Sequence, residues 1–270
     1  LTDTHCHIHE ALGTANLSTE TKARYKKAGS PTPDNMVTAA IANDVTRMLC
    51  IGTTLEDSEI AVAFAKDRNA VWASIGIHPH EAKSYAGNQK ALQRFAKLVR
   101  QPKVVAIGEC GLDYHYNHSL PADQEIVLRF QIELALEHGL ALVFHVRDAF
   151  DDFWNIFDEY KGIQGVIHSF SAGRQELEKI LDRGLYVGLN GIMTFTKVNE
   201  QLEAAKAVPL AKLLLETDAP FLTPAPRRGT ICEPKHARVT AEFLSQLRGE
   251  PIEEIAARTT ENAQTVFGLR

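Results

Sequence analysis

Val104-Val105-Ala106-Ile107-Gly108-Glu109 is an apolar run that ends in a carboxylate, and Leu213-Leu214-Leu215-Glu216-Thr217-Asp218 repeats this pattern. Two further runs, Leu142-Val143-Phe144-His145 and Gly165-Val166-Ile167-His168, end in imidazoles instead. Short apolar runs of this kind are typical of buried parallel strands. A parallel α/β barrel gathers the carboxyl ends of its strands around one mouth, so the four runs predict a cluster of polar side chains there.

Runs rich in Val, Ile and Leu alternate along the chain with longer stretches of helical period, which is the pattern of repeated βα units. We expect eight strands, near Thr2–Ile8, Arg47–Ile51, Val71–Ile77, Val104–Glu109, Ala141–His145, Gly165–His168, Leu185–Leu189 and Leu213–Asp218. Eight strands fit a closed barrel, so the sequence predicts an α/β fold, a TIM-type (β/α)8 barrel formed by residues 1–270 as a single domain. An open doubly wound sheet would usually show a Gly-rich phosphate turn after its first strand, and the sequence has none.

The segments between these strands carry helix signals. Pro121 can open a helix that ends before Gly139. This helix is expected to have an apolar face that contains Ile126, Val127, Phe130 and Leu134. A second stripe of this kind contains Phe150, Phe153, Trp154 and Phe157. We interpret both stripes as helix packing on the barrel and not as ligand sites.

The composition excludes several classes of protein. The chain has 270 residues, 44% of them hydrophobic, and its formal charge of -5 argues against a broad basic face for duplex nucleic acid. No stretch approaches the roughly 20 apolar residues of a membrane span, and the first residues lack the parts of a signal peptide. The four cysteines are widely spaced, which predicts free thiols in a reducing compartment. We therefore expect a soluble, cytoplasmic protein without a membrane segment and, since no apolar seam stands out, without an obligate protein partner.

The first predicted strand, Thr2–Ile8, carries two histidines. Residues two apart on a strand point to the same side, so His5 and His7 face one way while Cys6 faces the other. Two imidazoles at this spacing can bind one ion. An isolated pair of this kind is more often hydrogen-bonded without a metal, so the interpretation depends on the other strand ends.

Six side chains at or near five strand ends could bind metal: His5, His7, Glu109, His145, His168 and Asp218. This mixed set of nitrogen and oxygen ligands suits Zn, Mn or Fe better than Mg or Ca. The competing interpretation is a salt-bridged cluster of capping residues. Because an isolated buried carboxylate is very costly, Glu109 and Asp218 must be paired, hydrogen-bonded or metal-bound if they are buried. A carboxylate can hold two ions about 3.5 to 4 Å apart, and Glu109 on a central strand is the natural bridge.

Six segments of the chain resemble, in order, the TatD-type metal-dependent deoxyribonucleases, which belong to the amidohydrolase-like barrels. These segments are Asp3–His7, Gly76–His80, Gly108–Tyr114, Phe144–Ala149, His168–Gly173 and Glu216–Leu222. They extend over nearly the whole chain, so together they are far more specific than any one motif. The resemblance implies a TIM-type barrel, hydrolysis of phosphodiester bonds in DNA, and two divalent metal ions, which could be Mg, Mn or Zn.

The resemblance also implies how the ligands divide between the two ions. One ion would be held by His5, His7 and Asp218, the second by His145 and His168, and Glu109 would be shared. Glu109 and Asp218 are the candidate catalytic residues. Bound ions activate a water and polarise the phosphoryl oxygen. Asp218, beside that water, is the candidate general base, although it could also serve only as a ligand.

Further side chains near the strand ends are candidates for substrate binding: His78, His80, Tyr114, His115, Arg147 and Arg228. His78 and His80 follow the third strand, and in the family this segment lies beside the site, which suggests substrate contact and not metal binding. Tyr114 and His115 come shortly after Glu109 and could stack on a base or reach a phosphate.

The two arginines have an ordinary interpretation as well as a functional one. Arg147 could bind a phosphate oxygen, or it could form a helix-capping salt bridge with Asp148 or Asp151. Arg228, which follows Arg227 in a Pro-rich loop, could hold a phosphate or be a solvated surface residue.

The chain departs from the family pattern at two places. It reads Ile231-Cys232-Glu233-Pro234 where family members commonly read Arg-Asn-Glu-Pro, so contacts from that arginine and asparagine are absent. The stretch from His9 to Asn35 also looks longer than usual and sets basic residues around Tyr25, namely Lys22, Arg24, Lys26 and Lys27. These residues form either a solvated helix face or a segment at the mouth that guides the substrate strand.

The sequence therefore predicts a metal-dependent deoxyribonuclease. A mouth with few basic residues suits a flexible single-stranded end better than a long duplex, so we expect an exonuclease whose partner is single-stranded DNA. The alternative is a hydrolase of another ester on the same barrel, such as a D-aminoacyl-tRNA deacylase or a small phosphoesterase. A non-catalytic metal-binding scaffold is the third interpretation, and the intact ligand set argues against it.

Overall fold

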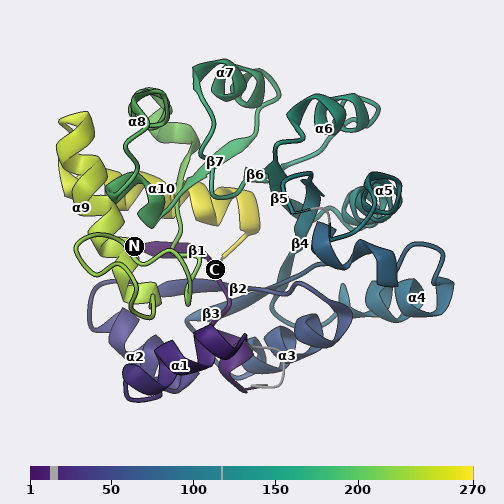
Figure 1. The fold of residues 1–270 in the computed structure, drawn as a ribbon, viewed down its shortest axis with the longest axis horizontal. Helices are drawn as coiled ribbons and strands as arrows, with labels where there is room; N and C mark the ends of the chain where they lie inside the picture. The colour runs from purple at the N-terminus through teal and green to yellow at the C-terminus, as the bar shows by residue number, and fades with distance from the viewer. Residues whose placement is uncertain (13–17, 117, 270) are drawn as a thin grey trace.

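The predicted strands form one parallel sheet in chain order. The computed structural model describes residues 1–12, 18–116 and 118–269, and these contain eight strands. The strands are β1 (Thr2–Cys6), β2 (Arg47–Ile51), β3 (Val71–Ile75), β4 (Val104–Asp113), β5 (Ala141–Arg147), β6 (Gly165–Ile167), β7 (Tyr186–Leu189) and β8 (Leu213–Leu215). Every neighbouring pair from β1 to β8 is parallel. The predicted TIM-type (β/α)8 fold is confirmed, and Figure 1 shows the strands at the centre with the helices around them.

The sheet closes through the residues that follow β8. Cys6 at the end of β1 forms a parallel bridge with Ala219. The Asp218 N–H donates to the His5 carbonyl at 2.8 Å, and the His7 N–H donates to the Ala219 carbonyl at 2.6 Å. This closure places Asp218 directly beside the two histidines of the first strand.

The connections between strands are mainly helical. The α-helices are α1 (Thr19–Lys27), α2 (Pro33–Ile41), α3 (Leu55–Lys66), α4 (Gln89–Leu98), α5 (Pro121–His138), α6 (Phe150–Phe157), α7 (Arg174–Asp182), α8 (Asn199–Ala207), α9 (Ala237–Arg248) and α10 (Ile252–Phe267). Short 3-10 helices are η1 (Ile8–Leu12), η2 (Pro79–Ser84), η3 (Gly191–Thr194), η4 (Leu210–Lys212) and η5 (Pro234–His236). In the described ranges, no helix is both long and apolar enough to cross a membrane.

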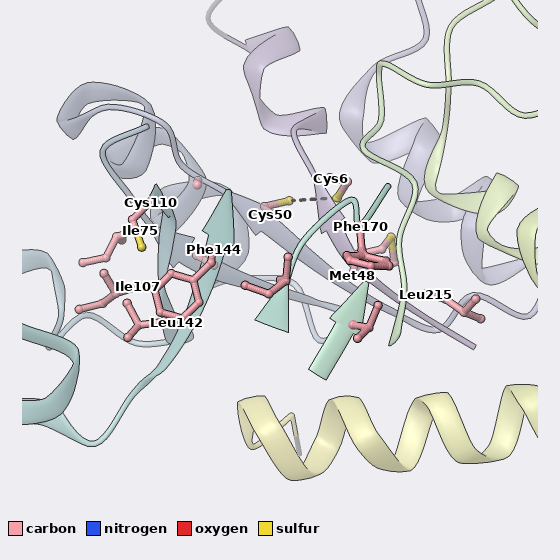
Figure 2. Close-up of a cluster of buried hydrophobic side chains, with 14 of the residues drawn as sticks. Cys6, Met48, Cys50, Ile75, Ile107, Cys110, Leu142, Phe144, Phe170 and Leu215 are labelled. Atoms are coloured by element: carbon pink, nitrogen blue, oxygen red, sulfur yellow. Dashed lines mark hydrogen bonds between the residues drawn. The ribbon is translucent and has the colours of Figure 1, made fainter. Parts of the chain in front are cut away.

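Side chains of the strands alternate between two buried clusters, as the pleat of a strand requires. On β2, Met48 and Cys50 pack outward against the helices, while Leu49 and Ile51 belong to the inner cluster. Figure 2 shows part of the outer cluster, including Phe144 of β5, with α10 beneath the strands. Phe267, at the end of α10, joins the inner cluster and covers the amino end of the barrel.

The predicted helices and thiols are largely confirmed. Helix α5 begins at Pro121 and ends at His138, just before Gly139, which has a left-handed φ of 64°. One position of its predicted stripe is wrong, because Ile126 is 50% exposed while the helix buries the face that carries Val127 and Leu134. Helix α6 buries Phe153, Trp154 and Phe157 as expected and leaves Phe150 partly buried. All four cysteines are buried and free.

The strand ends differ from the prediction at the mouth of the barrel. β1, β3, β6 and β8 end one to three residues earlier than expected, so His7, His168 and Asp218 lie just beyond their strands. β4 instead continues past Glu109 to Asp113, because its last four residues pair with β5 up to Arg147. This longer pair of strands changes which side chains reach the rim.

Candidate metal centre and active-site cavity

A cavity of about 870 Å³ opens at the carboxyl ends of the strands. Five of the six predicted ligands line it, namely His7, Glu109, His145, His168 and Asp218. The sixth, His5, is fully buried and contacts the ligands that form the cavity floor. The structure therefore brings together the six side chains that the strand-end pattern selected.

Glu109 lies at the centre of this cluster and faces two groups of imidazoles. Its Oε2 atom is 3.3 Å from Nε2 of His5 and 3.8 Å from Nε2 of His7. Its Oε1 atom faces three others: Nδ1 of His145 at 2.7 Å, Nε2 of His78 at 3.5 Å and Nε2 of His168 at 3.5 Å. The two oxygens of one carboxylate thus separate the cluster into two halves.

Close approach of β3 and β4 makes this position of Glu109 possible. A Cβ atom on Gly76 would lie 2.2 Å from the Glu109 nitrogen, so only glycine fits there. The residue two positions later, His78, follows this contact and reaches Glu109. The Gly-x-His spacing in this segment therefore has a steric reason.

Asp218 completes the half that contains His5 and His7. Its Oδ1 atom is 3.6 Å from Nε2 of His5 and 3.4 Å from Nε2 of His7. The two imidazole nitrogens are 3.1 Å apart. Asp218 has a left-handed φ of 59°, and the buried Asp3 fixes the preceding residue by accepting from the Thr217 hydroxyl at 2.6 Å. The backbone thus holds the Asp218 carboxylate over the two histidines.

Each of three imidazoles uses its second nitrogen to contact a fixed acceptor. Nδ1 of His7 lies 2.9 Å from the Ile51 carbonyl. The other two contacts are with carboxylates: Nδ1 of His168 lies 3.1 Å from Glu216 Oε2, and Nε2 of His145 lies 2.9 Å from Asp113 Oδ2. Such contacts fix the orientation and tautomer of histidines that bind metals.

The electrostatics of the cluster suit cations. Burial would raise the pKa of Glu109, but the surrounding imidazoles hold it well below its usual range. Burial lowers the pKa of His78 to about 4 and also lowers the pKa of His5. Burial acts in the same direction on His7 and His145, but their carboxylate partners outweigh it and raise the pKa of His7 to about 10 and that of His145 to about 9.

Metal binding requires ionised carboxylates and neutral imidazoles. Near neutral pH, Glu109 is ionised and His5 and His78 are neutral. At His7 and His145, divalent cations can replace the protons as the source of positive charge. Among the residues that the structure describes, three groups of donors lie close enough together to bind an ion: His5 with His168 and Asp218, His5 with His7 and Glu109, and His78 with Glu109 and His145. The residues therefore fit divalent cations. His78 was predicted to contact substrate and not metal, but its position also makes it a candidate ligand.

The candidate substrate residues divide between two cavities. His78, His80, Arg147 and Arg228 line the main cavity. Tyr114 and His115 line a neighbouring cavity of about 720 Å³, where they contact Asp152 and Asp148. The extension of β4 carries these two residues past the ligand cluster, so their contact with a base or a phosphate, from the neighbouring cavity, stays a prediction.

Among the described residues, Arg147 does not form the salt bridge with Asp148 or Asp151 that was considered for it. Asp148 pairs with His115 at 3.0 Å, and Asp151 lies 3.9 Å from Lys179. The Arg147 guanidinium lies over the Tyr116 ring, with its carbon 4.8 Å from the ring centre. The Arg228 guanidinium lies 3.5 Å from the centre of the Phe195 ring.

The stretch from His9 to Asn35 reaches the mouth of the barrel, although residues 13–17 lie outside the described part. Ser18 and Thr21, at the start of α1, line the main cavity. Tyr25 is buried, and Arg24 pairs with Glu20. The other basic residues of the helix, Lys22, Lys26 and Lys27, are exposed.

Sequence reasoning missed four residues that support the site, namely Asp3, Asp113, Tyr116 and Glu216. The matched segments include Asp3, Asp113 and Glu216, but no local pattern distinguishes a carboxylate that binds a metal from one that orients a ligand. Tyr116 lies beyond the matched segments, and only the path of the chain after β4 places it at the cavity.

Known proteins share this architecture and sequence. A model of the family described as TatD related DNase matches residues 2–268. The 3′-5′ ssDNA/RNA exonuclease TatD of Citrobacter koseri is 36% identical over 246 residues, which cover 87% of this chain and 93% of that protein. The protein of the same name from Escherichia coli K12 is 34% identical over 247 residues, with 87% and 93% covered. The solved structure of YjjV, a TatD homologue from Escherichia coli K12, has a TM-score of 0.84 at 26% identity and covers 99% of this chain and 98% of its own. These matches confirm the resemblance of the six segments, and the chain belongs to the TatD-related DNase family.

Proposed function

We propose that this protein is a metal-dependent 3′-5′ exonuclease that removes nucleotides from single-stranded DNA and RNA. The observation that carries the proposal is the position of Glu109, whose two oxygens face two separate groups of imidazoles on the floor of an open cavity. Relatives that are 36% and 38% identical and bear the name 3′-5′ ssDNA/RNA exonuclease support the substrate and the direction.

Two divalent ions would occupy the two halves of the cluster. His5, His7 and Asp218 would hold one, and Glu109 would contact both. The second would be held by His145 and His168, as the family resemblance implies, with His78 as a further donor because it lies close to Glu109 and His145. When bound, such ions lower the pKa of a water and offset the charge of a phosphodiester under attack.

Asp218 is the proposed general base. Its side chain is 17% exposed and faces the cavity, whereas Glu109 is only 6% exposed and surrounded by imidazoles. A base must reach the proton of the attacking water directly, and Asp218 is the carboxylate of the cluster with the more open face. Glu109 is proposed to act by holding the two halves together.

The walls of the cavity fit a flexible strand. Arg147 and Arg228 provide guanidinium groups that can hold phosphates without first breaking a strong ion pair. The formal charge of the chain is -5, which argues against the continuous basic track that a long duplex would require. A single-stranded end can enter the cavity and bring one phosphodiester bond to Glu109.

The test is degradation of end-labelled oligonucleotides by the purified protein with Mg, Mn, Zn or a chelator. Single-stranded DNA, duplex DNA and single-stranded RNA would be compared with label at either end. The variant Asp218→Asn removes the proposed base at nearly constant shape. Asp158→Asn is the matched control, since this carboxylate pairs with Arg183 on the surface, at 2.6 Å.

We expect metal-dependent shortening of the single strands from the 3′ end, retained in Asp158→Asn and reduced by about 100-fold or more in Asp218→Asn, since general-base catalysis contributes about 10²–10⁴-fold. Intact oligonucleotides under every metal, with metal binding demonstrated, would contradict the proposal. Activity on a D-aminoacyl-tRNA or a small phosphoester would then support the alternative hydrolase.

A further inference from the structure

Tyr116 is a large aromatic side chain that the fold leaves half exposed beside the metal centre. It is 51% exposed and lines the main cavity. His80 meets its ring edge-on with centres 5.5 Å apart, and His118 lies roughly parallel to it at 5.7 Å. An apolar ring with polar neighbours on a cavity wall is characteristic of a binding surface.

The backbone of Tyr116 is tied to the metal centre through one carboxylate. Asp113 Oδ1 accepts the Tyr116 N–H at 3.2 Å and the His115 N–H at 2.9 Å. The other oxygen, Oδ2, lies 2.9 Å from Nε2 of His145. Asp113 is buried, so the ring is held at a fixed position relative to a candidate metal ligand.

Arg147 connects the same ring to a potential phosphate site. Pairing of β4 with β5 places Arg147 opposite Asp113, and the Arg147 carbonyl accepts the Tyr114 N–H at 3.0 Å. Its guanidinium lies over the Tyr116 ring. Among the described residues, none of the acidic side chains around it forms an ion pair with Arg147.

We propose that Tyr116 is the stacking platform for one of the two bases that flank the bond to be cleaved, and that Arg147 then leaves the ring to hold a substrate phosphate. This inference rests on the proposed exonuclease function and names the residue that recognises the base. Any base offers a flat face, so the platform accepts all sequences, as an exonuclease needs.

The relative strengths of the two contacts favour this exchange. Stacking of a base on an aromatic side chain is worth about fivefold to over a hundredfold in affinity. An exposed guanidinium over a ring is worth only about twofold to fivefold. A base can therefore displace Arg147 from Tyr116, and the freed guanidinium gains a charged partner.

The experiment compares ordinary single-stranded DNA with oligonucleotides that carry one abasic nucleotide, either at the 3′ end or next to it. For the wild type we expect kcat/KM to fall by about tenfold at one of the two positions. Tyr116→Ala should lower kcat/KM on the ordinary strand by a similar factor and show no further loss on the abasic strand. Tyr116→Phe should retain the wild-type pattern.

Tyr186→Ala is the matched control. Tyr186 also carries a cation on its ring, Lys212 at 4.5 Å, but it begins β7 at the opposite end of the barrel. This variant should keep the wild-type preference for the complete base.

Two outcomes overturn the inference. If kcat/KM falls by the same factor on the abasic strand for Tyr116→Ala as for the wild type, the base does not bind Tyr116. If the wild type does not distinguish the abasic strands at either position, no base is recognised. Both are distinct from failure of the proposed function, in which the wild type would leave the ordinary strand intact and the inference would fall with it.

Discussion

Asp113→Asn tests whether the carboxylate beneath the rim orients a metal ligand. Asp113 Oδ2 contacts His145 at 2.9 Å and His80 at 3.0 Å, while Oδ1 accepts two backbone N–H groups. Burial would raise the pKa of Asp113, but these contacts hold it well below its usual range, so the group is ionised. Asparagine has one acceptor oxygen in place of two, so one pair of donors must face an amide N–H group.

The magnitude of the effect follows from the hydrogen bonds that asparagine cannot accept. A hydrogen bond to a charged group contributes roughly 1.5–3 kcal/mol, and loss of the partner that orients a metal-binding histidine usually costs about 10–100-fold in metal affinity. We expect Asp113→Asn to weaken the binding of the ion at His145 by about 10–100-fold. Asp152→Asn is the matched control, because Asp152 accepts the Tyr114 hydroxyl at 2.9 Å outside the ligand cluster.

The assay is competition of the protein with a fluorescent chelator for Zn²⁺ and Mn²⁺. Thermal unfolding in a chelator separates a loss of metal affinity from a loss of stability. The reasoning fails if Asp113→Asn binds both ions within about threefold of the wild type, which lies below the range for a lost orienting partner. It also fails if Asp152→Asn weakens binding equally.

Three further predictions concern the rim, the ligand support and the stability of the fold. The basic residues of α1 are Lys22, Arg24, Lys26 and Lys27. Replacing them with Ser should weaken binding of single-stranded DNA and flatten its dependence on salt, as measured by fluorescence anisotropy. An unchanged slope would mean that this helix face is only solvated. Gly188→Ala should lower nuclease activity at least about tenfold, because its Cβ would lie 2.0 Å from Glu216 Oε1 and displace the carboxylate that orients His168; wild-type rates would contradict this role. Burial lowers the pKa of His236 from 6.5 to about 4, so the unfolded chain binds more protons between these values and the free energy of unfolding falls as the pH drops. Between pH 7 and pH 5 this loss is at most about 2 kcal/mol, and urea unfolding should show a smaller loss for His236→Gln.

The clustering of the six candidate ligands could be predicted from the sequence because its geometry follows from the strand pattern. Residues two apart on a strand face the same side, and the His7 N–H continues the strand pairing just beyond β1, so His5 and His7 point together. Parallel strands in a barrel bring their carboxyl ends to one mouth, so Glu109 and Asp218 had to meet them. None of these steps requires knowledge of where a loop runs.

The contacts of the rim could not be predicted, because they depend on pairing between distant segments. The apolar pattern of β4 ends at Glu109, yet the strand continues to Asp113 because β5 extends to Arg147 beside it. Nothing local to either segment specifies this extension. It moves Tyr114 to the neighbouring cavity and brings Tyr116 to the main one.

This difference has a consequence for substrate choice within such barrels. The positions of the ligands depend on the strand period, and changes in the loops leave this period intact. The positions of Tyr116 and Arg147 depend instead on how far β4 and β5 extend past the mouth. Chains that keep all six ligands can therefore differ in the side chains that meet the substrate. Under the proposed function, binding energy at these rim positions would decide which bond reaches the ligand cluster, so the extension of β4 and β5 would determine which ends are accepted.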